Sequence, residues 1–480
     1  MTENEERPQP IRKGRVVRAA PMLGMASRTA GEAVVASLRK KVTGKDTSAE
    51  VHARAAERYV QSLGRSKGVL MKAGQLLSFV SFAPAVDGDY QRVYRTALAR
   101  LQDDAPPMPT EVARGVVTAE LGAPPEEVFA EFTPEPLAAA SIGQVHAARL
   151  HDGRQVAVKI QYPGVAEAIR ADLGNTELLA TFFQLARPLA GGMTRVDVRK
   201  LAHEAAERIG EELDYRREAA NQAEFADAYR GHPFIRVPEV ISELSTGRVF
   251  TMGLAEGMRW SQALTVDDQA LKDQWAEAVY RFTLGTLRRF GLFNADPHPG
   301  NYLFNADGTV TFLDFGCVKR FSRRQVSGIR DLVQATAAGD ADGVFAAMAE
   351  AGFIDVSNPD LPEPAEVLAY FRTSLRPIVD PQPFTYTSDH AAEAVRSMFS
   401  PFGPQSSVVR RLSIRPDYLL LTRIDLGMTA VLAELNATGP WDAICREWDH
   451  GDPPATPYGE LDQAFWRENA DNRDRAGSLG

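Results

Sequence analysis

Gly291-Leu-Phe-Asn-Ala-Asp-Pro-His-Pro-Gly-Asn-Tyr-Leu-Phe304 is followed, after a short turn, by Val310-Thr-Phe-Leu-Asp-Phe-Gly316. These two segments place Asp296 five residues before Asn301, and Asp314 at the end of an apolar strand pattern. Nucleotide phosphoryl transfer needs one carboxylate to orient the nucleophile, and an oxygen ligand with a second carboxylate to hold magnesium. We therefore predict Asp296 as a catalytic residue and Asn301 and Asp314 as metal ligands.

The alternative is that these segments are two unrelated turns. An Asp-Phe-Gly alone is weak evidence, because any such triplet can end a strand in a turn. Here both signals occur in kinase order, and the turn sequence Asn305-Ala-Asp-Gly308 predicts a hairpin between them. The combination favours a nucleotide site.

Composition limits the class of protein. The chain has 480 residues, 44% of them hydrophobic and 24% charged, which suits one large two-lobed unit or two to three globular domains. A net charge of −9 argues against a general nucleic-acid binder. The 2 cysteines, Cys317 and Cys445, cannot form a disulfide framework, so a reducing cytoplasm is expected.

The amino-terminal segment is predicted to be a disordered basic arm. Residues 1–47 are rich in Arg and Lys and show neither a signal peptide nor a membrane helix. A solvated arm is the ordinary interpretation, and contact with acidic lipid headgroups is the alternative. We expect a cytoplasmic protein whose membrane contact, if any, is peripheral.

Residues 48–125 are predicted to form a helical extension. Lys72 and Gln75 are three residues apart, so both would project from one helix face, and Gly74 allows a close approach there. A surface helix would explain such a pair equally well when it is taken alone.

The pattern from residue 128 to 159 predicts three strands, with Pro136–Gly143 as the loop between the first two. Such a hairpin covers the nucleotide in a kinase amino-terminal lobe, and Val156-Ala-Val-Lys159 supplies a lysine for the phosphates. Alanines replace the usual glycines, which predicts a stiffer loop. The expected nucleotide-binding residues are Ala138, Ala139, Ala140, Ser141, Gly143 and Lys159.

A helix is predicted over residues 198–229. Glu218 on it is a suitable partner for Lys159, because that lysine must stay charged and extended. Glu212 and Asp214 form a second acidic pair that would face Lys72 or a metal. A solvated helix face is the alternative for so many acids.

The remaining pattern predicts mainly helices. Residues 236–241 and 247–252 are expected as the last strands of the first lobe, and residues 254–257 as a hinge. A long helix over residues 267–290 would lead to the catalytic segment. The chain then looks helical to about residue 448, and the residues from 452 are predicted to be a loose polar tail.

The motifs resemble those of the UbiB/AarF family of atypical, protein-kinase-like kinases, which are tied to isoprenoid quinone biosynthesis. The resemblance spans roughly residues 50–435. It implies that the Lys72 helix folds over the active site, so that its ammonium pairs with Glu212 or Asp214. The matching segments are Lys72-Ala-Gly-Gln75, Ala138-Ala-Ala-Ser-Ile-Gly-Gln144, Val156-Ala-Val-Lys159, Glu212-Leu-Asp214 with Glu218, Asp296-Pro-His-Pro-Gly-Asn301 and Asp314-Phe-Gly316.

Two features depart from that family. Asn294 stands where a histidine is usual, which affects the packing of the catalytic loop but not the magnesium ligands. The carboxy-terminal part also lacks the membrane-spanning helices of some bacterial members.

The sequence therefore predicts an α+β, two-lobed protein-kinase-like fold with a helical N-terminal extension. The expected boundaries are 1–47 for the arm, 48–125 for the extension, 126–252 for the N-lobe with a helical insertion, 253–450 for the C-lobe and 451–480 for the tail.

The expected function is a magnesium-dependent ATP-binding kinase or ATPase that supports isoprenoid quinone or other lipid metabolism and does not phosphorylate proteins in trans. Its expected partners are the nucleotide and an isoprenoid lipid or quinone precursor. One alternative is a nucleotide-gated lipid-binding or scaffold protein, suggested by the apolar Leu76-Leu-Ser-Phe-Val-Ser-Phe82. Another is an aminoglycoside-type small-molecule kinase, which would not require the Lys72 and Glu212 motifs.

Overall fold

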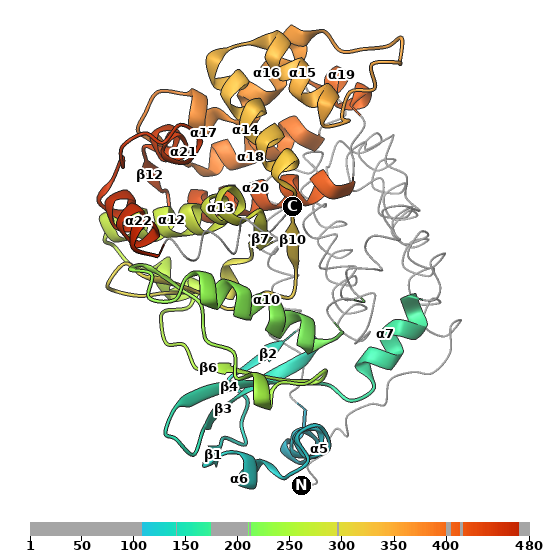
Figure 1. Ribbon diagram of the computed structural model, residues 1–480, viewed down its shortest axis with the longest axis vertical. Helices are drawn as coiled ribbons and strands as arrows, with labels where there is room; N and C mark the ends of the chain where they lie inside the picture. The colour runs from blue at the N-terminus through green and yellow to red at the C-terminus, as the bar shows by residue number, and fades with distance from the viewer. Residues whose placement is uncertain are drawn as a thin grey trace, which may run out of the picture.

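The protein has an α+β fold of two lobes, which confirms the predicted fold class (Figure 1). A small lobe built on a sheet lies at the bottom of Figure 1, and a larger helical lobe lies above it. The predicted extension with Lys72 and Gln75 falls outside the described residues. The computed structural model describes residues 108–140, 142–173, 210, 213–294, 297–399, 405–412 and 416–469.

The small lobe is an antiparallel five-stranded sheet. Both β1 and β2 pair with β3, β3 pairs with β4, and β4 pairs with β6. Side chains alternate between the two faces of a strand, so Lys159 points away from the face that buries Val158 and Ile160. The strands are β1 (Glu131–Phe132), β2 (Ala138–Ala140), β3 (Gly143–Arg149), β4 (Gln155–Gln161) and β6 (Val249–Gly253).

Two helices precede this sheet, α5 (Thr110–Leu121) and α6 (Pro125–Val128). Apolar side chains of α5, including Val117, pack against the buried valines of β4 and form the core of the lobe. Thr110 is the first residue of α5, and its hydroxyl donates to the Pro134 carbonyl at 3.1 Å. This bond ties α5 to the start of the hairpin.

The predicted loop Pro136–Gly143 is wrong over its middle residues. Ala138 pairs with Val145 and Ala140 with Gly143, so the alanines form β2 and only a tight turn remains. Alanine has no preference for positive φ, and extended backbone there satisfies its hydrogen bonds in the ladder.

The predicted helix over residues 198–229 also differs in its described part. Helix α10 (Tyr215–Ala228) begins only after Asp214, which has extended backbone and accepts a hydrogen bond from the Arg216 amide at 3.0 Å. An N-cap aspartate therefore ends any continuous helix at this point. In Figure 1, α10 lies between the sheet and the helical lobe, whereas α7 (Val165–Leu173) lies to one side.

The strand expected at residues 236–241 is mostly absent. Only β5 (Ile235–Arg236) forms, and it pairs in parallel with β9 (Val310–Phe312) of the helical lobe. Val240 makes an isolated bridge to Met252. Pro238, which lies between Arg236 and Val240, has no backbone N–H and cannot continue a ladder of hydrogen bonds.

The helical lobe begins with α11 (Trp260–Ala263) and a long helix that confirms the one expected at 267–290. That helix runs through α12 (Gln269–Tyr280), a π-helical turn η2 (Arg281–Gly285) and α13 (Thr286–Phe290). Two strand pairs then frame the catalytic segment, as β7 pairs with β10 and β8 with β9. Their bounds are β7 (Leu292–Asn294), β8 (Tyr302–Phe304), β9 (Val310–Phe312) and β10 (Val318–Arg320).

The rest of the described lobe is mainly helical, as expected, with one small strand pair, β11 with β12. None of the helices within the described ranges has the length and apolarity needed to cross a bilayer. The elements are α14 (Arg323–Ala338), α15 (Ala341–Glu350), α16 (Pro364–Ser374), α17 (Arg376–Val379), β11 (Phe384–Thr385), α18 (Ser388–Phe399), α19 (Ser406–Arg411), α20 (Pro416–Glu434), β12 (Thr438–Gly439) and α21 (Trp441–Asp449).

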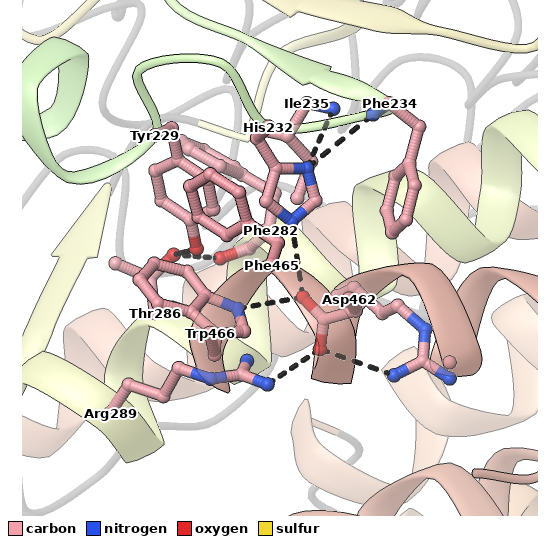
Figure 2. Close-up of polar contacts among 12 residues, drawn as sticks. Tyr229, His232, Phe234, Ile235, Phe282, Thr286, Arg289, Asp462, Phe465 and Trp466 are labelled. Atoms are coloured by element: carbon pink, nitrogen blue, oxygen red, sulfur yellow. Dashed lines mark hydrogen bonds and ion pairs between the residues drawn. The ribbon is translucent and has the colours of Figure 1, made fainter. Parts of the chain in front are cut away.

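The predicted polar tail contains a packed helix, α22 (Pro457–Glu468). Phe465 and Trp466 of this helix are buried, and Figure 2 shows Asp462 between the side chains of His232, Trp466 and Arg289. The polar composition hid an amphipathic pattern whose apolar face completes the core of the lobe. The expectation of a loose tail is therefore wrong over this helix.

Candidate nucleotide and magnesium site

An ion pair joins the small lobe to α10. Lys159 of β4 donates through Nζ to Oε1 and Oε2 of Glu218, at 2.7 and 2.8 Å. The side chains are 12% and 7% exposed, so water screens the pair little. The structure thus brings together the two residues that the sequence predicted as partners.

The charges around this pair keep Lys159 protonated. Burial disfavours its charged form, but the carboxylates of Glu218 and, next, Asp314 outweigh burial and raise the pKa of the Lys159 ammonium. Asp314 therefore lies close enough to interact with the lysine, although the two residues belong to different lobes. A permanent cation at this point is what an approaching phosphate requires.

Asn301 and Asp314 are held next to each other by the backbone. Asn301 ends the short 3₁₀ helix η3 (Pro299–Asn301), and its carbonyl accepts from the Leu313 amide at 2.9 Å. Asp314 Oδ1 accepts from the Gly316 amide at 2.9 Å, which fixes the direction of this carboxylate. The backbone therefore places the two predicted metal ligands on adjacent segments.

The start of β3 requires glycine at position 143. A Cβ there would overlap the carbonyl oxygen of Ile160 and come within 2.8 Å of the Tyr215 hydroxyl. Ala138, Ala139 and Ala140 form the strand that leads into the turn before β3. Gly143 therefore lies tightly against β4, next to Lys159.

Several predicted residues fall outside the described part of the chain. Asp214, which is described, caps α10, and the structure does not test its predicted pairing with Lys72. The residues outside the description are Lys72, Gln75, Ser141, Glu212 and Asp296.

Sequence reasoning missed Tyr215. This side chain is 1% exposed, and its hydroxyl makes no hydrogen bond within the described ranges. Its ring centroid lies 5.1 Å from Lys159 Nζ, and burial raises the pKa of the phenol so that it stays neutral. The signal was available, because Tyr215 lies three residues before Glu218 and so on the same helix face.

Two asparagines of the site were also missed as hydrogen-bond donors. Asn294 Nδ2 donates to the Asp314 carbonyl at 2.7 Å, and Asn221 Nδ2 donates to the Phe315 carbonyl at 3.0 Å. The departure from histidine at position 294 therefore keeps a donor directed at the Asp-Phe-Gly backbone.

The donor set fits magnesium held together with a nucleotide. Amide and carboxylate oxygens of Asn301 and Asp314 are hard ligands that magnesium accepts. No cluster of three or more His, Cys, Asp or Glu side chains suited to a metal occurs in the part of the chain that the structure describes. Few protein ligands are expected when phosphate oxygens and water complete the coordination.

Comparison with known proteins identifies the family. Residues 100–348 match the ABC1 atypical kinase-like domain. The chain belongs to this family. The resemblance to UbiB/AarF proteins, drawn from the six motifs, is thereby confirmed.

Three relatives illustrate the likeness. Atypical kinase COQ8B of Rattus norvegicus is 37% identical over 60% of this chain and 53% of its own length, and atypical kinase COQ8 of Saccharomyces cerevisiae is 32% identical over 62% and 57%. The solved complex of Rv3197 with erythromycin from Mycobacterium tuberculosis is 30% identical and has a TM-score of 0.59. The match covers 85% of this chain and 98% of the Rv3197 chain. The chain spans only about half of the length of these two curated kinases.

Proposed function

We propose that this member of the family binds magnesium-ATP between its two lobes and hydrolyses it or transfers its terminal phosphoryl group. The observation that carries the proposal is the buried pair Lys159–Glu218, with Asp314 close enough to raise the pKa of the same lysine. Membership of an atypical kinase-like family supports kinase chemistry at this coarse level.

Each residue has a role in this proposal. Glu218 holds Lys159 extended, and the ammonium pairs with phosphate oxygens. Asn301 and Asp314 would hold magnesium, which neutralises phosphate charge when it is bound. Asp296 would orient the attacking hydroxyl or water, while the alanine strand and Gly143 position the hairpin over the phosphates.

The acceptor proposed here is not a protein. Lys72 and Gln75 are proposed to close the site to peptides and to pair with Glu212 or Asp214, as the resemblance implies. Isoprenoid quinone or other lipid metabolism is the proposed pathway, and the likeness to the COQ8 kinases supports it. A cytoplasmic protein with peripheral membrane contact is the proposed setting.

The test is magnesium-dependent ATP turnover by the purified chain, alone and with liposomes or a phenolic quinone precursor. Turnover should require magnesium and should fall by at least about a hundred-fold in Asp314→Asn and in Asp296→Asn. Asp360→Asn, in the loop before α16, is the matched control and should keep wild-type turnover. Wild-type protein without turnover under all these conditions would overturn the proposal.

A second candidate function is nucleotide-gated binding of a large apolar molecule without useful phosphoryl transfer. The observation that favours it is the match to Rv3197, a protein whose solved complex contains erythromycin, over 98% of that chain. Calorimetry with erythromycin and with isoprenoid lipid, each with and without magnesium-ATP, tests it. Affinity that changes with nucleotide supports this function, and absence of binding in every arm rejects it.

A further inference from the structure

The backbone of Asp314-Phe-Gly316 is held by two side-chain amides from different parts of the fold. Asn294 lies at the end of β7, opposite Val318 of β10, and donates to the Asp314 carbonyl at 2.7 Å. Asn221 lies on α10 and donates to the next carbonyl, that of Phe315, at 3.0 Å. Consecutive carbonyls of the metal-binding loop are thus fixed from the helical lobe and from α10.

The orientation of the Asn221 amide is set by its other neighbour. Arg320 Nη1 lies 3.4 Å from Asn221 Oδ1, and the same guanidinium bonds Glu224 one turn further along α10. An arginine can only donate, so Oδ1 must be the accepting atom, and Nδ2 must face Phe315. Because Arg320 belongs to β10, it also links α10 to the strand that pairs with Asn294.

Helix α10 contacts the loop through the Phe315 ring as well. The ring centroids of Phe225 and Phe315 are 4.8 Å apart. Glu218, Asn221 and Phe225 have the spacing i, i+3, i+7, which places all three on one face of the helix. One face of α10 therefore contacts the Lys159 ammonium and both the carbonyl and the ring of Phe315.

We propose that Asn221 and Asn294 are positioning residues that hold Asp314 in its metal-binding conformation, so that α10 places the lysine pair and the metal loop together. If either amide is lost, the peptide that it holds gains freedom to rotate, and the Asp314 carboxylate turns with it. The inference rests on the proposed function of the site. It predicts weaker magnesium binding rather than weaker binding of the nucleotide itself.

The test uses the full chain and the variants Asn221→Leu and Asn294→Leu, which keep side-chain size and remove the donor. The affinity for a fluorescent ADP analogue in EDTA should stay within about two-fold of wild type. The magnesium concentration that gives half-maximal tightening of ADP binding should rise by about ten-fold or more, which corresponds to about 1.4 kcal/mol. Asn294→His, which restores an N–H donor, should return to within about three-fold of wild type.

Asn469→Leu is the matched control, because Asn469 donates a side-chain amide to the Phe465 carbonyl at 2.9 Å, remote in sequence from the site motifs. Its magnesium requirement should equal that of the wild type. Serine variants at positions 221 and 294 serve if the leucine variants do not fold. Unchanged magnesium dependence in these variants, or a histidine variant as weak as the leucine one, overturns the inference alone. A wild-type chain without magnesium-dependent binding overturns the proposed function and this inference with it.

Discussion

The buried charges around Lys159 can be compared with those around Asp462, which lie under α22. Lys159 pairs with Glu218, and the charge of Asp314 also raises the pKa of this lysine. Under α22, Asp462 Oδ1 accepts from His232 at 3.1 Å and from Trp466 at 2.8 Å, as Figure 2 shows. Burial by itself does not separate a functional charge from a structural one.

The two sets differ in how completely their members are satisfied by the chain. Asp462 Oδ2 also bonds Arg289 at 2.5 Å and lies 3.6 Å from Arg281, so both of its oxygens are engaged. These partners lower the pKa of Asp462 far below its usual range despite the opposing effect of burial. Around Lys159, one cation interacts with the carboxylates of Glu218 and Asp314, and this arrangement suits a ligand that brings further negative charge and a metal.

The largest expected effect is the loss of ATP turnover when Lys159 is replaced. Lys159→Met removes the cation that pairs with the phosphates, so magnesium-dependent ATP turnover should fall on the order of a thousand-fold. Lys272→Met is the control, because Lys272 donates to the Leu264 carbonyl at 3.1 Å on α12 and should not affect turnover. Equal losses in both variants would show that the assay follows folding rather than the site.

The second effect concerns stability. Asp462→Ala leaves the buried Arg281 and the half-buried Arg289 without this partner and should lower the free energy of unfolding by about 3–5 kcal/mol in urea denaturation. The control is Asp227→Ala, because Asp227 pairs with Arg230 at 2.6 Å on the surface, and its loss should cost less than about 1 kcal/mol. If the two variants unfold alike, the network under α22 does not stabilise the fold.

The smallest effect comes from a carboxylate that belongs to neither set. Asp425 of α20 makes no hydrogen bond or ion pair within the described ranges, and burial raises the pKa of Asp425 to about 6. The folded chain therefore binds a proton that the unfolded chain lacks between roughly pH 4 and 6, so this residue's contribution to stability falls as pH rises through that window.

Asp425→Asn removes the free-energy cost of burying an ionised carboxylate at this position. At pH 8 the free energy of unfolding of the variant should exceed that of the wild type by about 1–2 kcal/mol. This difference should shrink as the pH is lowered toward 4. Urea denaturation at both pH values measures it. A variant that is less stable than the wild type at pH 8 would show that Asp425 has a favourable partner.

The pairing of Lys159 with Glu218 was predictable from the sequence because the motifs that contain them occur in a fixed order. Lys159 follows an apolar strand pattern, and Glu218 comes next on a predicted helix. Asp296 and Asn301 then have the spacing expected of a phosphoryl-transfer site, and Asp314 follows them. The bonds of Asn221 to the Phe315 carbonyl were not predictable, because their partner is a backbone atom 94 residues away. No side-chain pattern marks an acceptor of that kind.

The network under α22 was missed for a different reason. Asp462 lies in a segment whose polar composition predicts a loose tail, and its partners come from residues far earlier in the chain. The pattern of Tyr458, Phe465 and Trp466 could have indicated a helix with one apolar face. The pairing of Asp462 with His232 and two arginines depends on tertiary packing that one sequence does not display.

The most direct test of the proposed nucleotide and magnesium site is thermal stabilisation of the wild type and of Asp314→Asn by ATP and ADP, each with magnesium and with EDTA. A ligand at about 100 times its dissociation constant adds about 2.7 kcal/mol to folding. We expect a magnesium-dependent rise in melting temperature for the wild type, and none for Asp314→Asn. A rise that is the same in both proteins, or absent from the wild type, would contradict it.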